Sequence, residues 1–199
     1  MTTGKAYANK KQKGLHPEGD FYPTPKSLVW VAKDLIKKEF SLKEEILEPC
    51  CGNGAISDEL RKLGFSVTEN DLFTGGVDYL QHKFSQKQII TNPPFSLWDA
   101  FIHKAKNEAD KVLVIGRLNY FGTHSRLKNG IWNNLKSVHC FDRYVDYRTP
   151  ERNDGLFQVG AMATAWFLWE RDFVGSATLH FLSVQSYVEA PCDSGFCMT

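Results

Sequence analysis

The feature that most restricts the fold of this chain is the alternation of short apolar runs with longer segments of helical periodicity. The runs EILEP, KQII and KVLVIG alternate with segments such as AISDELRKLG and LWDAFIHKAKNEA. Strands that are separated by helices of this length form βαβ units, in which neighbouring strands are parallel. The sequence therefore predicts an α/β fold, with a mostly parallel sheet and helices on both faces.

Further elements follow from the same patterns. One continuous helix is predicted over residues 26–40, and a weaker helix in THSRLKNGIWNNL, where Gly130 interrupts the pattern. Gly64 is expected to end the helix AISDELRKLG, because glycine is favoured at the left-handed position after a helix. RYVDYRTPERNDG is expected to be a long polar loop. Other predicted strands are FSVT, DYL, SVHCF, AMATAWFLWE and ATLHFLSV.

The 199 residues are long enough for one domain with a buried core. We expect residues 1–20, which contain several lysines, to form a basic and flexible arm that is either a solvated tail or a contact for phosphates. We expect the folded domain to span residues 21–182 and an irregular tail to span residues 183–199. The formal net charge is +1, so a polyanionic partner would have to meet a local basic patch.

Two compositional features bear on location. No apolar run approaches the length of a membrane span, and the first residues lack the apolar segment of a secretory signal. The five cysteines do not form the paired spacings of a zinc site or a disulfide framework, so no metal site is expected. We therefore expect reduced thiols, a cytoplasmic location and no contact with a membrane.

A glycine-rich turn follows the first predicted strand. In ILEPCCGNGA, Glu48 ends the strand and Gly52 and Gly54 allow a sharp turn that a ligand can approach closely. Asp71 follows the next strand, where a carboxylate can accept hydrogen bonds from both ribose hydroxyls of a nucleoside. Ser57 occupies the place of the third glycine of the dinucleotide motif, so the pattern favours a nucleoside cofactor over NAD.

A second stretch, TNPPF at residues 91–95, ends the predicted strand KQII. Proline has no N–H to give to a sheet, so the strand must stop here. A turn with Phe95 in the core is one interpretation, and a catalytic loop is the other. The segments around the stretch favour the second.

These segments together resemble a known family. EPCCGNG resembles the first motif of class I S-adenosylmethionine-dependent methyltransferases, and TNPPF resembles the fourth motif of those that methylate amines. FYPTP is similar to the segment that closes over the methionine part of the cofactor, while VTENDL and VDYL fit the second and third motifs. The resemblance covers roughly residues 20–170, in the motif order of adenine-N6 methyltransferases, and the nearest likeness is to small DNA adenine methyltransferases of phages and prophages.

The resemblance implies a Rossmann-like fold with a seven-stranded sheet, S-adenosylmethionine as cofactor, and methyl transfer to the N6 amine of adenine in DNA. The catalytic residues that it implies are Asn92, Pro93, Pro94 and Phe95. The implied cofactor-binding residues are Phe21, Tyr22, Pro23, Thr24, Glu48, Pro49, Cys50, Gly52, Gly54, Asp71, Leu72, Asp78, Tyr79 and Asn92.

The chemistry of an exocyclic amine explains the residue types in TNPPF. The amine is a poor nucleophile, because its lone pair is delocalised into the ring. The side-chain oxygen of Asn92 and the carbonyl of Pro93 are acceptors that would hold the two amine hydrogens and direct the lone pair at the methyl group. Pro93 and Pro94 stiffen the backbone in advance, and Phe95 offers a face on which an extruded base can stack.

Contacts with the substrate are expected from arginine, tyrosine and lysine side chains. Arginines interleaved with tyrosines in RYVDYRTPERNDG suit phosphates and bases, although neighbouring acids make a solvated loop equally compatible; RLNYFGTHSR is a second candidate. About thirty residues follow AWFLWE, which we expect to be too few for a separate recognition domain. Specificity would then be loose, come from loops and the basic arm, or be supplied by a homodimer or a separate specificity partner. The expected substrate-binding residues are Phe95, Arg143, Arg148, Lys10 and Lys11.

Several alternative activities share these motifs. RNA adenine is the closest alternative to DNA adenine, and the amine of cytosine is compatible with the same mechanism. A glutamine side chain of a protein, or a non-catalytic subunit that binds cofactor or nucleic acid, fits less well. Methylation at position 5 of cytosine needs a cysteine nucleophile after the fourth strand. The Pro-Cys pairs of this chain, at residues 49–50 and 191–192, lie elsewhere.

Overall fold

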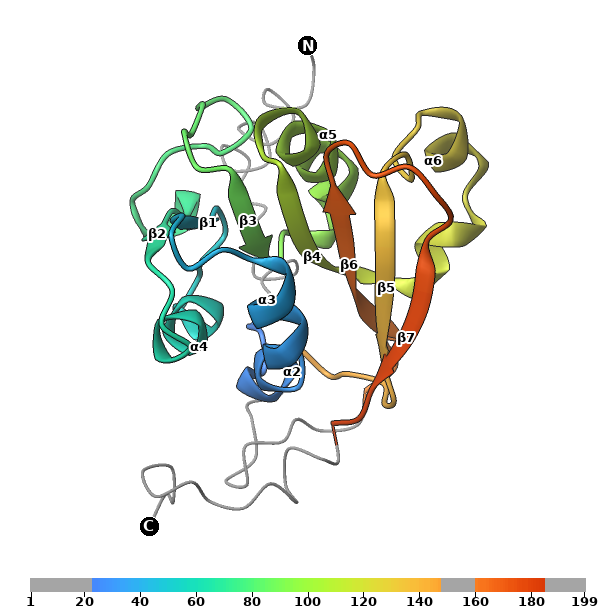
Figure 1. Ribbon diagram of the computed structural model, residues 1–199, viewed down its shortest axis with the longest axis horizontal. Coiled ribbons are helices and arrows are strands. Elements are labelled where there is room, and N and C mark those ends of the chain that lie inside the picture. The colour runs from blue at the N-terminus through green and yellow to red at the C-terminus, as the bar shows by residue number, and fades with distance from the viewer. Residues whose placement is uncertain (1–22, 148–159, 185–199) are drawn as a thin grey trace, which may run out of the picture.

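The structure, a computed structural model, describes residues 23–147 and 160–184 (Figure 1). In this part of the chain, seven strands form one sheet in the order β2-β1-β3-β4-β6-β5-β7. β6 is antiparallel to β4 and to β5, and all other neighbouring strands of this sheet are parallel. The mostly parallel sheet predicted from the sequence is confirmed. The strands are β1 (Ile46–Glu48), β2 (Val67–Glu69), β3 (Gln88–Thr91), β4 (Lys111–Arg117), β5 (Leu135–Phe141), β6 (Thr164–Glu170) and β7 (Thr178–Leu182).

Helices cover both faces of the sheet, as predicted. On one face, the indole of Trp166 donates to the carbonyl of Leu28 at 2.9 Å, and Figure 1 shows the N-terminal helices in front of the sheet. The next residue of β6, Phe167, points the other way and meets Trp98 at the start of α5, with 5.7 Å between ring centroids. The helices are α2 (Lys26–Trp30), α3 (Lys33–Glu39), α4 (Ala55–Lys62), α5 (Trp98–Glu108) and α6 (His124–Lys128), with 3₁₀ turns η2 (Leu72–Thr74), η3 (Phe95–Leu97) and η4 (Leu118–Gly122).

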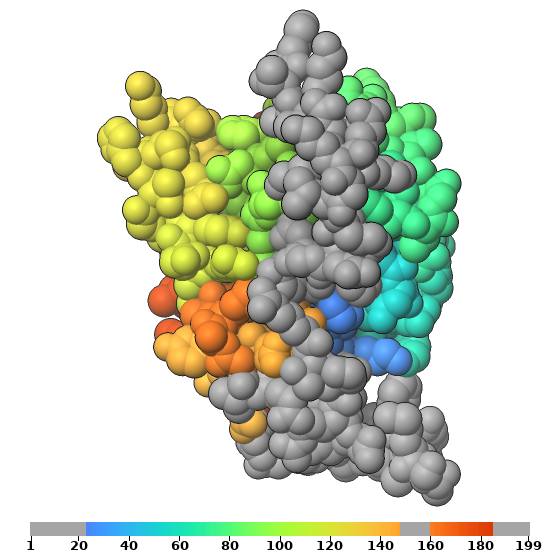
Figure 2. All heavy atoms as spheres, turned by 180° about the vertical axis from the view of Figure 1, so that it is seen from behind, coloured from blue at the N-terminus to red at the C-terminus, as the bar shows by residue number. Residues whose placement is uncertain are grey.

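The back of the molecule presents segments that flank the sheet. Figure 2 shows the segment around η2, in green, and the segment around α6, in yellow, on opposite sides of this face. Among the described residues, no helix combines the length and the apolar character needed to cross a bilayer.

The predicted helix over residues 26–40 is wrong in one respect, because two helices replace it. α2 ends at Trp30 and α3 begins at Lys33. In a continuous helix, the N–H of Ala32 would bond to the carbonyl of Leu28. That carbonyl instead accepts from Trp166 of β6, and the N–H of Ala32 bonds to Val29 at 3.1 Å. A tertiary contact has therefore broken the helical ladder.

The strand predicted at DYL is also wrong. Asp78 begins a turn in which its carbonyl accepts from the N–H groups of Gln81 and His82, both at 3.0 Å. ATLHFLSV does form a strand, β7, which pairs with β5 at the edge of the sheet. The weaker helix predicted around Gly130 is short, since α6 ends at Lys128 and Gly130 has a φ of +67°.

An aromatic cluster fills the space between the sheet and α5. Trp98 is fully buried and its indole N–H donates to the carbonyl of Ile115 at 2.9 Å. Gly116, the next residue of β4, lies directly against the indole. A Cβ at Gly116 would come within 2.8 Å of two indole atoms, closer than a Cβ normally approaches another heavy atom. The cluster therefore requires glycine at this position.

Replacing Gly116 with alanine is expected to lower the free energy of unfolding by about 1–3 kcal/mol, because the added methyl group overpacks a rigid core. Gly122→Ala is the matched control, since a Cβ there meets nothing within 4 Å. Urea denaturation of both variants measures the difference. Equal stability of Gly116→Ala and Gly122→Ala would show that Trp98 moves without cost.

Candidate active site

The two motif-bearing turns lie at the same edge of the sheet. β1 ends at Glu48 and leads into the glycine-rich turn, whereas β3 ends at Thr91 and leads into TNPPF. β1 and β3 are parallel neighbours, with Ile46 opposite Gln88. Because the carboxyl ends of parallel neighbours meet at one edge, the fold brings these two turns side by side.

Glu48 is the most deeply buried acid of the site, at 1% exposure. Loss of water around the carboxyl group raises the pKa of Glu48 to about 8, although a hydrogen bond from Ser57 acts in the opposite direction. The hydroxyl of Ser57 donates to Oε2 of Glu48 from the first turn of α4. The residue that replaces the third glycine of the dinucleotide motif therefore anchors the acid at the end of β1.

The glycine-rich turn has the backbone that its sequence predicts. Gly52 has a φ of +53° and Gly54 a φ of +81°, both in the left-handed region that favours glycine. The N–H of Gly52 donates to Oδ2 of Asp71 at 3.0 Å, and the N–H of Phe73 donates to Oδ1 at 2.8 Å. These bonds fix the carboxylate of Asp71 against the turn. Each carboxylate oxygen has a second lone pair, so Asp71 can still accept from a ligand hydroxyl.

Asn70 holds the loop that follows Asp71, and the sequence analysis did not single it out. Its amide accepts from the N–H of Val77 and donates to the carbonyl of Val77, both at 2.9 Å. The loop returns so closely that a Cβ at Gly76 would lie 2.6 Å from Oδ1 of Asn70. The sequence does contain a signal for this role. Asn70 lies between two acids directly after a strand, a position where polar side chains often bond to nearby backbone.

The other predicted cofactor-binding residues differ in how deeply they are buried. The side chain of Asp78 accepts from the N–H of Leu80 at 2.9 Å and is half-buried, as are Leu72 and Cys50. Pro49 is buried beside Glu48. The side chain of Tyr79 belongs to the core, at 2% exposure, with its ring stacked on Phe101 at 5.1 Å. Only the main chain of Tyr79 is therefore suited to meet a ligand.

The acceptor stretch is tied to the segment before α2. The side-chain amide of Asn92 donates to the hydroxyl of Thr24 at 3.1 Å, across 68 positions of sequence. Asn92 and Pro93 are buried, and Pro94 and Pro23 are half-buried. Because Nδ2 of Asn92 is directed at Thr24, its side-chain oxygen is held on the other side of the amide. The fold thus brings Thr24 of FYPTP to Asn92 of TNPPF.

Phe95 lies in an aromatic and cationic environment. It is a core residue at 7% exposure, so little of its ring is open to a base, and the ring forms an edge-to-face pair with that of Tyr147 with 5.9 Å between centroids. The guanidinium carbon of Arg117 lies 4.7 Å from the centroid of the Phe95 ring. The hydroxyl of Tyr120 donates to the carbonyl of Phe95 at 3.3 Å. Arg117 and Tyr120 come from RLNYFGTHSR, the second candidate segment of the sequence analysis.

The predicted substrate residues are only partly placed. Arg143 is half-buried, and Tyr144 beside it is exposed. Tyr147 is fully buried, so the arginine–tyrosine loop contributes one of its tyrosines to the site wall rather than to the surface. Phe21, Tyr22, Lys10, Lys11 and Arg148 lie outside the described residues.

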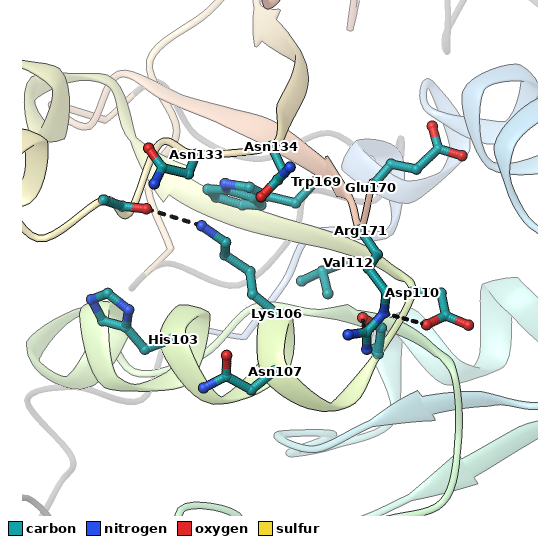
Figure 3. Close-up of a pocket in the computed structure, with 12 residues that line it drawn as sticks. His103, Lys106, Asn107, Asp110, Val112, Asn133, Asn134, Trp169, Glu170 and Arg171 are labelled. Atoms are coloured by element: carbon teal, nitrogen blue, oxygen red, sulfur yellow. Dashed lines mark hydrogen bonds and ion pairs between the residues drawn. The ribbon is translucent and has the colours of Figure 1, made fainter. Parts of the chain in front are cut away.

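A separate cavity of about 340 Å³ lies at the opposite end of the strands, where β4 begins and β6 ends (Figure 3). Lys106 extends into it from α5 and donates to the carbonyls of Gly130 and Ile131 at 3.1 and 3.0 Å. Burial lowers the pKa of Lys106. Arg171 pairs with Asp110 at 2.6 Å in the same wall. Because both cations already have partners, the cavity offers little to an anionic ligand.

Replacing Glu48 with glutamine is expected to raise the free energy of unfolding at pH 8.5, by about 2–4 kcal/mol, and to change it much less at pH 5. The pKa of Glu48 is about 8 in the folded protein and near 4.5 when the chain is unfolded. Between these values the unfolded chain has lost the proton that the folded chain keeps, so the stability of the wild-type protein falls as pH rises. Glutamine does not ionise and escapes this loss.

Urea denaturation at the two pH values measures the effect of Glu48→Gln. Glu44→Gln is the control, since Glu44 is exposed. A stabilisation by Glu48→Gln that did not depend on pH would show that the buried carboxyl group does not change its protonation on folding.

Comparison with known proteins adds to this geometry. No protein-family model matches the chain, and no curated protein matches it in sequence. Solved structures do match. A class I S-adenosylmethionine-dependent methyltransferase assigned in Listeria monocytogenes is 15% identical, with a TM-score of 0.55 over 90% of this chain and 71% of that chain.

Two further structures match at similar identity. A modification subunit assigned to a type I restriction enzyme of Vibrio vulnificus is 14% identical, with a TM-score of 0.51 over 89% of this chain. A protein of Pyrococcus horikoshii assigned as an RNA methyltransferase is 16% identical, with a TM-score of 0.50 over 78% of this chain and 87% of that chain. This chain spans half the length of the Vibrio subunit. At these identities the likeness concerns the fold, and the chain has the Rossmann-like fold of class I methyltransferases.

Proposed function

We propose that this protein transfers a methyl group from S-adenosylmethionine to the exocyclic N6 amine of adenine in DNA. The observation that carries the proposal is the meeting of two turns at the carboxyl ends of β1 and β3. One turn holds Asp71 against Gly52, and the other holds Asn92 against Thr24. The likeness of the fold to class I methyltransferases supports the same conclusion.

The residues at the end of β1 fit a nucleoside cofactor. The left-handed backbone at Gly52 and Gly54 leaves this turn without side chains, so a ligand can approach its N–H groups. The carboxylate of Asp71 is oriented before any ligand binds, and its remaining lone pairs suit ribose hydroxyls. Asp78 and the main chain of Tyr79 would meet the adenine, and Pro23 and Thr24 the methionine end. When bound, S-adenosylmethionine supplies a methyl group that its sulfonium has already activated.

The residues at the end of β3 would prepare the amine. Asn92 and Pro93 present a side-chain oxygen and a main-chain carbonyl from buried positions, where weak solvent screening strengthens hydrogen bonds. Both accept hydrogens of the amine, which favours a pyramidal nitrogen with its lone pair directed away from the ring. The Thr24 contact and the proline pair fix these acceptors in advance, so little reorganisation is needed during the reaction.

DNA and RNA are the two candidate substrates of the proposed reaction. The Vibrio relative of the fold is a modification subunit of a restriction enzyme, and the Pyrococcus relative is assigned to RNA. We favour DNA because the motif order resembles that of DNA adenine methyltransferases, and we keep RNA adenine as the second candidate. We further propose that a second copy or a separate specificity subunit supplies sequence recognition.

Removal of the Asp71 carboxylate tests the cofactor part of the proposal. Asp71→Ala is expected to weaken binding of S-adenosylmethionine by about 1.5–3 kcal/mol, the cost of lost hydrogen bonds to the ribose. Isothermal titration calorimetry measures the affinity, and thermal unfolding checks that the variant remains folded. Asp34→Ala is the control, because Asp34 is an exposed acid of α3. Unchanged affinity in Asp71→Ala would remove this residue from the cofactor site.

Removal of the Asn92 side chain tests the catalytic part. Asn92→Ala is expected to slow methyl transfer by about 10²–10³, while binding of S-adenosylmethionine stays within a factor of a few. Transfer of a radiolabelled methyl group to duplex DNA, single-stranded DNA, RNA and host protein, followed by nucleoside analysis, identifies substrate and product. N6-methyladenine in DNA supports the proposal, whereas N4-methylcytosine would show that the substrate base is cytosine. Wild-type turnover by Asn92→Ala would return TNPPF to the role of a turn.

A further inference from the structure

Arg117 occupies an unusual position beside the proposed catalytic stretch. It is the last residue of β4, and its guanidinium carbon lies 4.7 Å from the centre of the Phe95 ring. The side chain is half-buried, and its Nε is fully shielded from solvent without a hydrogen-bond partner. No carboxylate of residues 23–147 and 160–184 forms an ion pair with Arg117, in contrast to Arg126 and Arg171, which pair with acids at 2.7 and 2.6 Å.

The hydroxyl groups around Arg117 already form hydrogen bonds with other groups of the protein. Thr164 is opposite Arg117 in the antiparallel pairing of β4 and β6, and its hydroxyl bonds to that of Tyr147 at 2.9 Å. The hydroxyl of Tyr120 donates to the carbonyl of Phe95. These contacts leave the shielded N–H of Arg117 as a donor that still needs an acceptor. A shielded donor without a partner destabilises the protein, and a ligand acceptor would offset this cost.

The chemistry of guanidinium restricts the acceptor. Arginine donates through five N–H groups, accepts nothing and stays protonated, so it recognises lone pairs and rejects N–H groups. Its planar group also stacks on aromatic rings and bases. Because Phe95 is nearly buried and Arg117 lies over its ring, a base that entered beside Phe95 would come within reach of the guanidinium group.

The amine of adenine is flanked by two ring nitrogens, N1 and N7, and both are acceptors. Asn92 and Pro93 would accept from the amine, and a donor beside them would complete the pattern. Guanine and thymine present N–H and carbonyl groups where adenine presents N1 and the amine.

We propose that Arg117 is a specificity-determining residue, which donates a hydrogen bond from its guanidinium group to a ring nitrogen of a target adenine bound beside Phe95. This inference rests on the proposed function, and it adds the group that recognises the base to those that activate its amine. Arg117 and Asn92 then have complementary roles, because Arg117 donates to the ring and Asn92 accepts from the amine.

Base analogues test the inference directly. Single-stranded oligonucleotides carry adenine, 1-deazaadenine or 7-deazaadenine at the target position, and kcat/KM for methyl transfer is measured for the wild-type protein and for Arg117→Met. Methionine keeps apolar contact with Phe95 but has no donor. The wild-type protein is expected to lose about tenfold or more on one of the two analogues, and Arg117→Met to lose a similar factor on adenine without a further loss on that analogue.

Three outcomes with the Arg117→Met variant would overturn the inference. If Arg117→Met loses the same factor on adenine and on both analogues, Arg117 does not contact a ring nitrogen. A loss that is uniform over all bases and reduces the slope of log kcat/KM against log salt by about one would assign Arg117 to a phosphate. Full activity of Arg117→Met on adenine would show that Arg117 does not take part.

Controls separate this inference from the proposed function. Arg171→Met removes an arginine from the opposite edge of the sheet and is expected to keep wild-type specificity. Thermal unfolding and S-adenosylmethionine binding of Arg117→Met exclude a loss of fold. Absence of methyl transfer by the wild-type protein to any adenine substrate overturns the proposed function and the inference together. A wild-type protein that methylates adenine without a response to either deaza substitution overturns the inference alone.

Discussion

The parallel pairing of β1 with β3 is the constraint on which the rest of the site depends. It is a short ladder, with Ile46 opposite Gln88 and Leu47 opposite Ile89. Because side chains alternate along a strand, a shift of one residue would turn Glu48 or Thr91 to the wrong face of the sheet. The register therefore decides that the glycine-rich turn and TNPPF leave the sheet together, and a site between them exists only for this register.

Burial of polar groups then fixes the site. Glu48, Asp71 and Asn92 are all nearly inaccessible to solvent, and each has a hydrogen bond within the protein. Their partners are Ser57, the N–H of Gly52 and the hydroxyl of Thr24, which come from three different segments. Since a buried polar group without a partner is costly, these bonds orient the side chains before any ligand arrives. The site is preorganised by the same contacts that close the fold.

The two ends of the sheet differ in how completely their charges are paired. At the end away from the candidate site, Lys136 bridges Glu39 and Glu170 at 2.6 and 2.8 Å, and Lys111 lies within 3.6 Å of both acids. At the site, Arg117 keeps a shielded donor without a partner. Paired charges stabilise one end, whereas the unsatisfied donor at the other end is a feature expected where a ligand completes the structure.

The sequence by itself determined the α/β alternation, the glycine-rich turn and the end of β3 at two prolines, because these depend on local periodicity and on backbone chemistry. It also placed Asn92, Glu48 and Asp71 at strand ends. Only the tertiary structure decided that α2 and α3 are separate, since Trp166 takes the Leu28 carbonyl, and that residues 78–80 form a turn. It likewise decided that Thr24 meets Asn92, that Tyr79 enters the core and that Arg117 lies over Phe95. The contacts of Trp166 with Leu28, of Thr24 with Asn92 and of Arg117 with Phe95 join segments far apart in the chain, and no local pattern of residues encodes such contacts.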